Sequence, residues 1–295
     1  MPPQLISLSG QTLAAITRNE HLRGTPVVFI HGITSNVDLW EPSLPESIRN
    51  GRRWISLGLP GHHPARIDST TFSSWNAVTP AVWADWYERA LSQLVGDEPV
   101  DVVGWSTGGF SGLTLAVHYP RRVRSLLSIS GFATGRWLGW LGFFQRLSLS
   151  PLTRWGVPIG IRAIGQKRWL FDRMMSSAIR DDSAFHASPI REQIMRDWFG
   201  AFASHDPLAM SELFRKIAQF DFSDQVGRIN CPTLISGGVL DPYIPVSHTR
   251  WIADHVPNAE LVLWPGAGHL FFAERTREYQ ELLVRWLDRQ GLPNG

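Results

Sequence analysis

The segment GWSTG, residues 104–108, holds a serine between two glycines, a spacing that suits nucleophilic chemistry. An apolar run, Val100 to Val103, precedes it, and small residues typical of a helix start follow it. This order predicts a strand, a sharp turn and a helix, with Ser106 on the turn. Glycine is required on both sides because larger side chains would collide with the strand and the helix. Unpaired N–H groups at the helix start can stabilise developing negative charge.

Three further segments, together with GWSTG, resemble the α/β-hydrolase superfamily, and the resemblance runs from about residue 3 to residue 288. VVFIHG (27–32) resembles the strand that leads into the family's oxyanion loop. SGGVLDPYIP (236–245) resembles the loop that carries the catalytic acid, and GAGHLFFAE (266–274) resembles the loop that carries the catalytic histidine. The serine nucleophile argues against the dehalogenase and epoxide hydrolase branches, which use aspartate.

The resemblance implies a catalytic triad of Ser106, Asp241 and His269. It also implies an oxyanion hole formed by the backbone N–H groups of Ile33 and Thr107, and it implies no cofactor and no metal. In these roles His269 acts as the general base toward Ser106, and Asp241 orients the imidazole and stabilises its charged form.

The order of the residues agrees with this assignment independently of the resemblance. Serine, acid and histidine follow one another along the chain, as an α/β-hydrolase triad requires. The stretch between Asp241 and His269 has room for one helix and one strand, so both loops emerge at the same edge of a parallel sheet. Asp224 is the competing acid, but it lies before the strand that should present the acid.

Other histidines have more ordinary interpretations. His31 is expected to be a buried hydrogen-bonding residue of the oxyanion loop, and His62 and His63 follow a tight turn and are expected to be structural or exposed. The turn itself departs from the family, since many members have Asp-x-Pro-Gly-x-Gly where this chain has GLPGHH, residues 58–63. How the oxyanion loop is braced is therefore open.

Short apolar runs that alternate with helical patterns predict the scaffold for these residues. We expect an α/β fold with an eight-stranded, mostly parallel sheet, helices on both faces and an inserted helical cap. The first two strands look antiparallel. The predicted strands are 5–8, 13–17, 26–30, 54–57, 100–104, 123–130, 233–236 and 261–264. Among the helices, Thr79 and Pro80 mark one N-terminus, and Tyr279 to Leu287 form the apolar stripe of the last one.

Residues 132–228 interrupt this alternation with helical patterns and no convincing strand. We therefore expect a hydrolase core domain, residues 1–131 and 229–295, and a helical cap, residues 132–228. The cap is rich in large apolar side chains, which must pack on the core, line a substrate cavity or meet a membrane. Between Arg136 and Arg180 it carries eight basic residues and one acid. Two interpretations remain open, a cap whose arginines face water and weak contact with an anionic membrane.

Composition narrows the remaining classes of protein. The 295 residues carry 28 basic and 26 acidic side chains, a balance that does not indicate nucleic-acid binding. The N-terminus lacks the pattern of a secretion signal, which predicts a cytoplasmic protein. The single cysteine, Cys231, cannot form an internal disulfide and is expected to be a small buried residue before a strand.

These features predict a serine hydrolase that cleaves a carboxylic ester of a small molecule with an apolar acyl or alcohol group, through an acyl-enzyme. The same triad would also serve a lactone, thioester, amide or carbon–carbon bond hydrolase, or an acyltransferase. A ligand-binding receptor that keeps the fold but turns over little is the alternative from another class. The sequence leaves the oligomeric state open.

Overall fold

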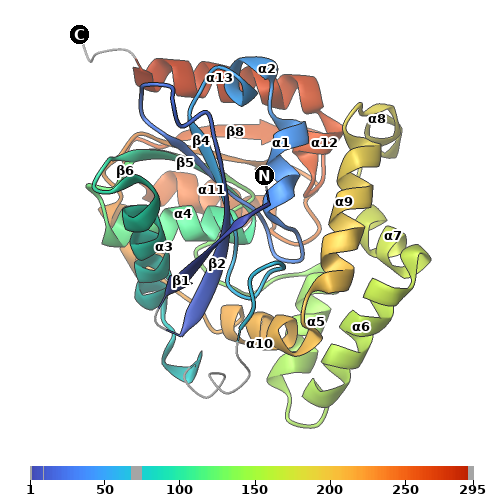
Figure 1. Cartoon of the computed structure of the whole chain (residues 1–295). Helices are drawn as coiled ribbons and strands as arrows, with labels where there is room; N and C mark the ends of the chain where they lie inside the picture. The colour runs from blue at the N-terminus through green and yellow to red at the C-terminus, as the bar shows by residue number, and fades with distance from the viewer. Residues whose placement is uncertain (1, 9, 68–74, 292–295) are drawn as a thin grey trace.

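The computed structural model describes residues 2–8, 10–67 and 75–291. These residues build an eight-stranded sheet with the strand order β1-β2-β4-β3-β5-β6-β7-β8 (Figure 1). The strands are β1 Gln4–Leu8, β2 Gln11–Arg18, β3 Val27–Ile30, β4 Trp54–Leu57, β5 Val100–Trp105, β6 Val123–Ile129, β7 Thr233–Gly238 and β8 Glu260–Trp264. β2 pairs antiparallel with β1 and with β4, and every other pairing is parallel. The predicted eight-stranded, mostly parallel sheet is confirmed.

Helices cover both faces of the sheet. Figure 1 shows α3 and α4 on one side and α1, α2 and α13 on the other. The helices are α1 Trp40–Ser43, α2 Glu46–Arg49, α3 Pro80–Val95, α4 Thr107–His118, α5 Gly139–Leu149, α6 Val157–Gln166, α7 Arg168–Ser176, α8 Asp182–Ala187, α9 Arg191–Ser204, α10 Pro207–Ile217, α11 Val246–His255, α12 Phe271–Glu274 and α13 Thr276–Gly291, with short 3₁₀ turns η1 Val37–Leu39, η3 Arg154–Gly156 and η4 Ser223–Arg228. None of the described helices is both long and apolar enough to cross a bilayer.

The buried strands follow directly from their composition. Every residue of β3, β4, β5 and β7 is buried, as expected for apolar strands covered by helices on both faces. The predicted helix signals also hold. The hydroxyl of Thr79 accepts a hydrogen bond from the N–H of Val82 at the start of α3, and Pro80 occupies the first turn. Tyr279, Trp286 and Leu287 of α13 are buried in the core.

The helices α5 to α10 lie between β6 and β7, inside the segment predicted to be inserted. The two ends of this segment lie side by side. The N–H of Gly135 donates to the carbonyl of Phe220 over 2.8 Å, and that of Phe222 donates to the carbonyl of Ala133 over 3.1 Å. Figure 1 shows α6 and α7 as the helices farthest from the sheet.

The aromatic residues of this segment divide into two groups. Trp137, Trp198 and Phe171 are buried, which agrees with two of the three expected possibilities, packing on the core or lining a cavity. Trp155 and Trp169, by contrast, are 70% and 65% exposed. Outside the segment, Cys231 is half-buried rather than fully buried, because it lies in the loop before β7.

Candidate active site

Ser106 lies on the turn between β5 and α4 with φ 57° and ψ −117°. A serine is rarely found at positive φ, so the surrounding structure must hold this conformation. A Cβ atom on Gly104 would lie 2.1 Å from the carbonyl oxygen of Gly108, and one on Gly108 would lie 2.0 Å from that of Ile30. Glycine is therefore required on both sides. The N–H of Ser106 donates to the carbonyl of Ile129 over 2.7 Å and ties the turn to β6.

Asp241 and His269 follow β7 and β8, which are neighbours in the sheet. Nδ1 of His269 lies 2.6 Å from Oδ2 of Asp241, and both side chains are almost completely buried. The other carboxylate oxygen accepts hydrogen bonds from the N–H groups of Tyr243 and Ile244, over 2.9 and 3.0 Å. Since a carboxylate only accepts, Nδ1 of His269 carries the proton and Nε2 is free to accept one.

Ser106 and His269 lie on the wall of one narrow cavity. Its volume is about 20 Å³, which is room for roughly one water molecule. Among the described residues, no hydrogen bond joins the side chains of Ser106 and His269. The structure thus brings Asp241 and His269 into contact and places Ser106 on the same cavity wall as His269. The remaining lining residues are Ile33, Thr34, Trp105, Leu141, Met174, Met175, Ala178, Trp198, Tyr243 and Leu270.

The loop after β3 packs directly against the serine turn. A Cβ atom on Gly32 would lie 2.8 Å from the ring of Trp105 and 3.0 Å from Cβ of Ser106, so glycine is required for this approach. Ile33 lines the cavity, and its N–H has no hydrogen-bond partner within the described part of the chain. Thr107 is the first residue of α4, where helical N–H groups have no partner in the helix. Both N–H groups are therefore available to a ligand.

Thr34, which follows Ile33 in this loop, has a strained backbone conformation. Its φ is 71°, which is costly for a β-branched residue. Its N–H donates to Nε2 of His62 over 3.1 Å, and its carbonyl accepts a hydrogen bond from the indole of Trp198 over 2.6 Å. These two contacts fix the orientation of the backbone that follows Ile33.

Three buried histidines brace the same loop, and each uses both ring nitrogens on backbone groups. His31 donates from Nδ1 to the carbonyl of Gly32 (2.8 Å) and accepts at Nε2 from the N–H of Leu59 (3.3 Å). His62 donates from Nδ1 to the carbonyl of Pro60 (3.1 Å) and accepts at Nε2 from the N–H of Thr34 (3.1 Å). His205 donates from Nε2 to the carbonyl of Ser35 (3.1 Å) and accepts at Nδ1 from the N–H of His63 (2.9 Å). Each ring donates once and accepts once, so each must be neutral.

The surroundings keep these rings neutral. Burial lowers the pKa of His31 to about 4 and that of His205 to about 3, and it lowers the pKa of His62 well below 6.5. The rings of His62 and His205 lie 4.8 Å apart, and those of His31 and His62 lie 5.2 Å apart. This histidine cluster is not arranged as a metal site, and within the described ranges no group of three or more His, Cys, Asp or Glu side chains is.

Glu274 links the loop of His269 to the inserted segment. Its buried carboxylate accepts hydrogen bonds from the N–H groups of Gly268, Arg180 and Asp181, at 3.0, 3.1 and 2.7 Å. The N–H of His269 in turn donates to the carbonyl of Ala178 over 2.8 Å. The inserted segment therefore holds the loop that presents the imidazole.

The structure shows which of the other residues considered from the sequence are buried and which are exposed. His31 and His62 are buried and hydrogen-bonded, as expected, whereas His63 is exposed. Asp224 is an exposed residue of η4 and does not line the cavity.

Sequence reasoning missed His205 and Glu274, and it did not assign Trp198 to the oxyanion loop. No motif marks His205 or the reach of Trp198, because both act across more than 160 residues of chain. Glu274 lies inside the GAGHLFFAE segment, so its position beside the histidine was the one available signal.

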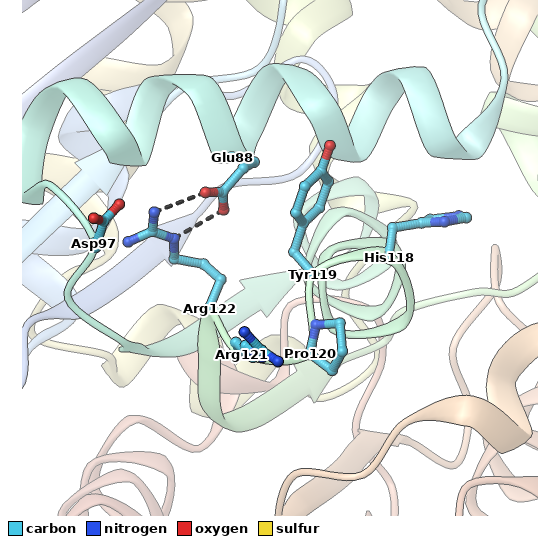
Figure 2. A pocket seen from close by; sticks show the side chains of 7 residues that line it. All are labelled: Glu88, Asp97, His118, Tyr119, Pro120, Arg121 and Arg122. Atoms are coloured by element: carbon cyan, nitrogen blue, oxygen red, sulfur yellow. Dashed lines mark hydrogen bonds and ion pairs between the residues drawn. The ribbon is translucent and has the colours of Figure 1, made fainter.

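A second hollow, of about 500 Å³, lies where the end of α4 meets α3 (Figure 2). Arg122 spans it and binds both carboxylate oxygens of Glu88 through Nε and Nη2, over 2.8 and 2.7 Å. The same guanidinium donates to the carbonyls of Gly96 and Glu98. Its donors are therefore occupied, and Ser106 and His269 do not line this hollow.

The chain is similar to known proteins over most of its length. A pimeloyl-[acyl-carrier protein] methyl ester esterase of Legionella pneumophila (strain Paris) is 22% identical over 274 residues, 92% of this chain and 96% of the relative. A proline iminopeptidase of Lactobacillus delbrueckii subsp. lactis is 26% identical over 220 residues, 72% of this chain and 74% of the relative.

Among solved structures, the enol-lactonase from Burkholderia xenovorans LB400 superimposes with a TM-score of 0.77 at 15% identity, covering 97% of this chain and all of that one. This likeness concerns the fold. The family described as alpha/beta hydrolase fold matches residues 25–276, a stretch that includes Ser106, Asp241 and His269. The chain therefore belongs to the α/β hydrolase family and is a hydrolase.

Proposed function

We propose that the protein is a serine hydrolase that cleaves carboxylic esters with a substantial apolar acyl or alcohol group. The observation that carries the proposal is the strained serine turn on the wall of the cavity that also exposes the imidazole of His269, with Asp241 hydrogen-bonded behind it. Relatives named as ester hydrolases support the choice of bond.

In the proposed mechanism Nε2 of His269 accepts the proton of Ser106 as Oγ attacks the carbonyl carbon. The oxyanion that forms is held by the N–H groups of Ile33 and Thr107. His269 then donates the proton to the leaving alcohol, which departs and leaves an acyl-enzyme. A water molecule, deprotonated by His269, releases the acid and restores Ser106. Asp241 stabilises the imidazolium throughout.

The cavity wall supports an apolar substrate. Leu141, Met174, Met175 and Leu270 line it, and the charged Asp241 is shielded behind His269. Apolar walls favour apolar groups because burial removes hydrocarbon surface from water.

We further propose that residues 132–228 act as a cap over Ser106. Leu141, Met174 and Trp198 come from this segment and form part of the cavity wall. A cap of this kind excludes water and shapes the substrate site.

A fluorophosphonate probe tests the nucleophile. We expect the probe to label the wild-type protein and not the Ser106→Ala variant, because Oγ is the atom that reacts. Ser111→Ala is a matched control, since Ser111 is buried in the same helix but donates to the carbonyl of Thr107. Absence of labelling in the wild type, or labelling that survives Ser106→Ala, would favour a ligand-binding protein.

A panel of substrates tests which type of bond the protein cleaves. p-Nitrophenyl esters of increasing chain length, lactones, thioesters and amides are compared by kcat/KM, with Ser106→Ala as the background. We expect long or aromatic esters to exceed acetyl esters. Equal values for short and long esters would contradict the apolar preference, and a higher value for lactones, thioesters or amides would reassign the bond while keeping the triad. An excess of transfer to an added alcohol would indicate an acyltransferase.

A further inference from the structure

Exposed apolar side chains are concentrated in one part of the molecule. Of the twelve exposed large hydrophobic side chains among the described residues, eight lie between residues 138 and 169. Four of them belong to the outermost elements and have exposed fractions of 61% to 83%, namely Leu152, Trp155, Ile159 and Trp169. The other four are Leu138, Trp140, Phe143 and Leu149. Side chains of this size seldom remain in water in such a group without a partner.

Trp155, Ile159 and Trp169 lie on three elements that pack on one another, and Leu152 lies in the turn just before the first of them. η3 packs on α6, and α6 packs on α7. The buried residues of α6, Val157 and Ile161, and of α7, Phe171 and Met175, define the inward faces of the two helices. Figure 1 shows α6 and α7 at the outer limit of the molecule, away from the sheet. We call the exposed face of residues 152–173 the outer face.

The charged side chains on this part of the chain are basic, with one exception. All eight basic residues between positions 136 and 180 are exposed, and the single acid, Asp172, pairs with Arg168 over 2.7 Å. Five of the basic residues belong to the outer face, namely Arg154, Arg162, Lys167, Arg168 and Arg173. Basic residues therefore alternate with Leu152, Trp155, Ile159 and Trp169 along the same short stretch.

From this combination we propose that the outer face docks on the surface of an anionic lipid membrane. Tryptophan and aliphatic side chains enter the boundary between headgroups and acyl chains, while arginine and lysine bind the anionic headgroups. Arginine and tryptophan are also enriched in protein interfaces, but the excess of basic over acidic side chains along the whole stretch matches the continuous negative charge of an anionic bilayer.

The outer face and the cavity wall are two sides of the same helix. Trp169 and Arg173 point outward from α7, whereas Met174 and Met175 line the cavity of Ser106. Docking would therefore place the cavity within one helix of the lipid surface. The proposal concerns binding alone and does not depend on the reaction at Ser106.

Sedimentation with vesicles tests the proposal. Purified protein is mixed with vesicles of phosphatidylcholine alone or of phosphatidylcholine with 30% phosphatidylglycerol, and the bound fraction is measured in the pellet. We expect retention on the anionic vesicles, little retention on the neutral ones, and loss of retention as sodium chloride is raised to 1 M, because salt screens the headgroup charges. Ser106→Ala should bind as the wild type does. No retention on anionic vesicles would overturn the proposal.

Two sets of variants locate the binding face. Trp155→Ser with Trp169→Ser should lower the partition coefficient at least tenfold. Leu5→Ser, which removes one apolar side chain that is 53% exposed on β1, should leave the partition coefficient unchanged. Arg154→Gln, Arg162→Gln and Arg173→Gln together should lower it roughly a hundredfold. In the matched charge control, glutamine replaces three exposed arginines elsewhere in the chain, Arg23, Arg250 and Arg285.

Three outcomes would contradict this location. Equal loss in the outer-face variants and their controls would mean that the attraction is general and that the outer face is not the docking site. Equal binding to neutral and anionic vesicles would remove the role of the arginines. A wild-type dimer in size-exclusion chromatography that Trp155→Ser and Trp169→Ser convert to a monomer would assign the face to a second copy of the chain. Far-UV circular dichroism and thermal unfolding verify that each variant is folded, whatever the reaction at Ser106.

Discussion

At the scale of single residues, Asp241 uses its two oxygens for different tasks. Oδ1 accepts two backbone N–H groups, and Oδ2 accepts Nδ1–H of His269. In Asp241→Asn the amide oxygen can keep the backbone contacts, but the NH₂ group then faces His269 and favours the wrong tautomer. We expect kcat to fall by about 10⁴ with little change in Tm. Measurement of kcat and thermal unfolding checks this, and Asp224→Asn, an exposed acid, serves as the control. An equal loss in Asp224→Asn would contradict the assignment of the acid.

Glu274 acts through the backbone that it holds. Glu274→Gln keeps one acceptor oxygen but replaces the other with a donor that faces backbone N–H groups. We expect the free energy of unfolding to fall by about 2 kcal/mol, because hydrogen bonds to a buried charged group are lost. We also expect kcat to fall, because the loop of His269 loosens. Urea unfolding and ester hydrolysis check both effects. Glu278→Gln, whose side chain is 56% exposed, should change neither, and an equal effect there would contradict a specific role for Glu274.

At the scale of elements, the histidine cluster makes stability depend on pH. Because the folded-state pKa values of these residues lie below 6.5, the unfolded chain binds more protons as pH falls. The stability that these residues contribute is therefore fully present above pH 6.5 and is lost as the pH falls toward 4, where His31 in the folded state is half protonated. Each histidine contributes about 1 kcal/mol of this loss between pH 7 and pH 5.5. Urea unfolding at the two values measures the loss.

His205→Gln isolates one member of the cluster. A glutamine can still donate to the carbonyl of Ser35 and accept from the N–H of His63, but it does not titrate. We expect the difference in unfolding free energy between pH 7 and pH 5.5 to shrink by about 1 kcal/mol. The exposed His21 provides the control His21→Gln, which should keep the wild-type difference. An unchanged difference in His205→Gln would mean that burial of this ring is not the cause.

The elements also show what a sequence can predict and what it cannot. β3, β5 and β7 are predictable because runs such as VVFI and DVVGW have few other ways to bury their side chains. The contact of Asp241 with His269 follows from adjacent strands ending at one edge. The bracing of Thr34 by Trp198 does not follow, because only packing decides which residue of a long helical segment reaches the oxyanion loop. The exposure of Trp155 could not be predicted from the sequence either, since an aromatic residue in a helical pattern suggests burial.

At the scale of the whole molecule, the inserted segment does more than cover the cavity. It contributes Trp198 and His205 to the support of the loop after β3, and residues 178–181 to the support of the loop of His269. A movement of the segment that opened the cavity completely would also release these supports. Substrate entry is therefore expected to involve a partial opening near α5 and α7, with α9 and residues 178–181 remaining in place.

One contact on the opening side can be removed without touching these supports. The hydroxyl of Ser177, just after α7, lies 2.7 Å from the hydroxyl of Tyr243 in the core. Tyr243 lines the cavity of Ser106, which holds only about one water molecule. Ser177→Ala removes this hydrogen bond, and with it the one that the same hydroxyl donates to the carbonyl of Met174 within the end of α7 over 2.6 Å. The contact with Tyr243 is worth about 0.5 to 1.5 kcal/mol, and its loss should shift the balance between closed and open forms by about two- to tenfold. We expect kcat/KM for a long-chain ester to rise by that factor and kcat/KM for an acetyl ester to rise less, because the longer ester needs the wider opening. Ser176→Ala is the matched control, since its hydroxyl donates within α7 to the carbonyl of Asp172. An unchanged or lower kcat/KM for the long-chain ester in Ser177→Ala would show that this contact does not limit entry.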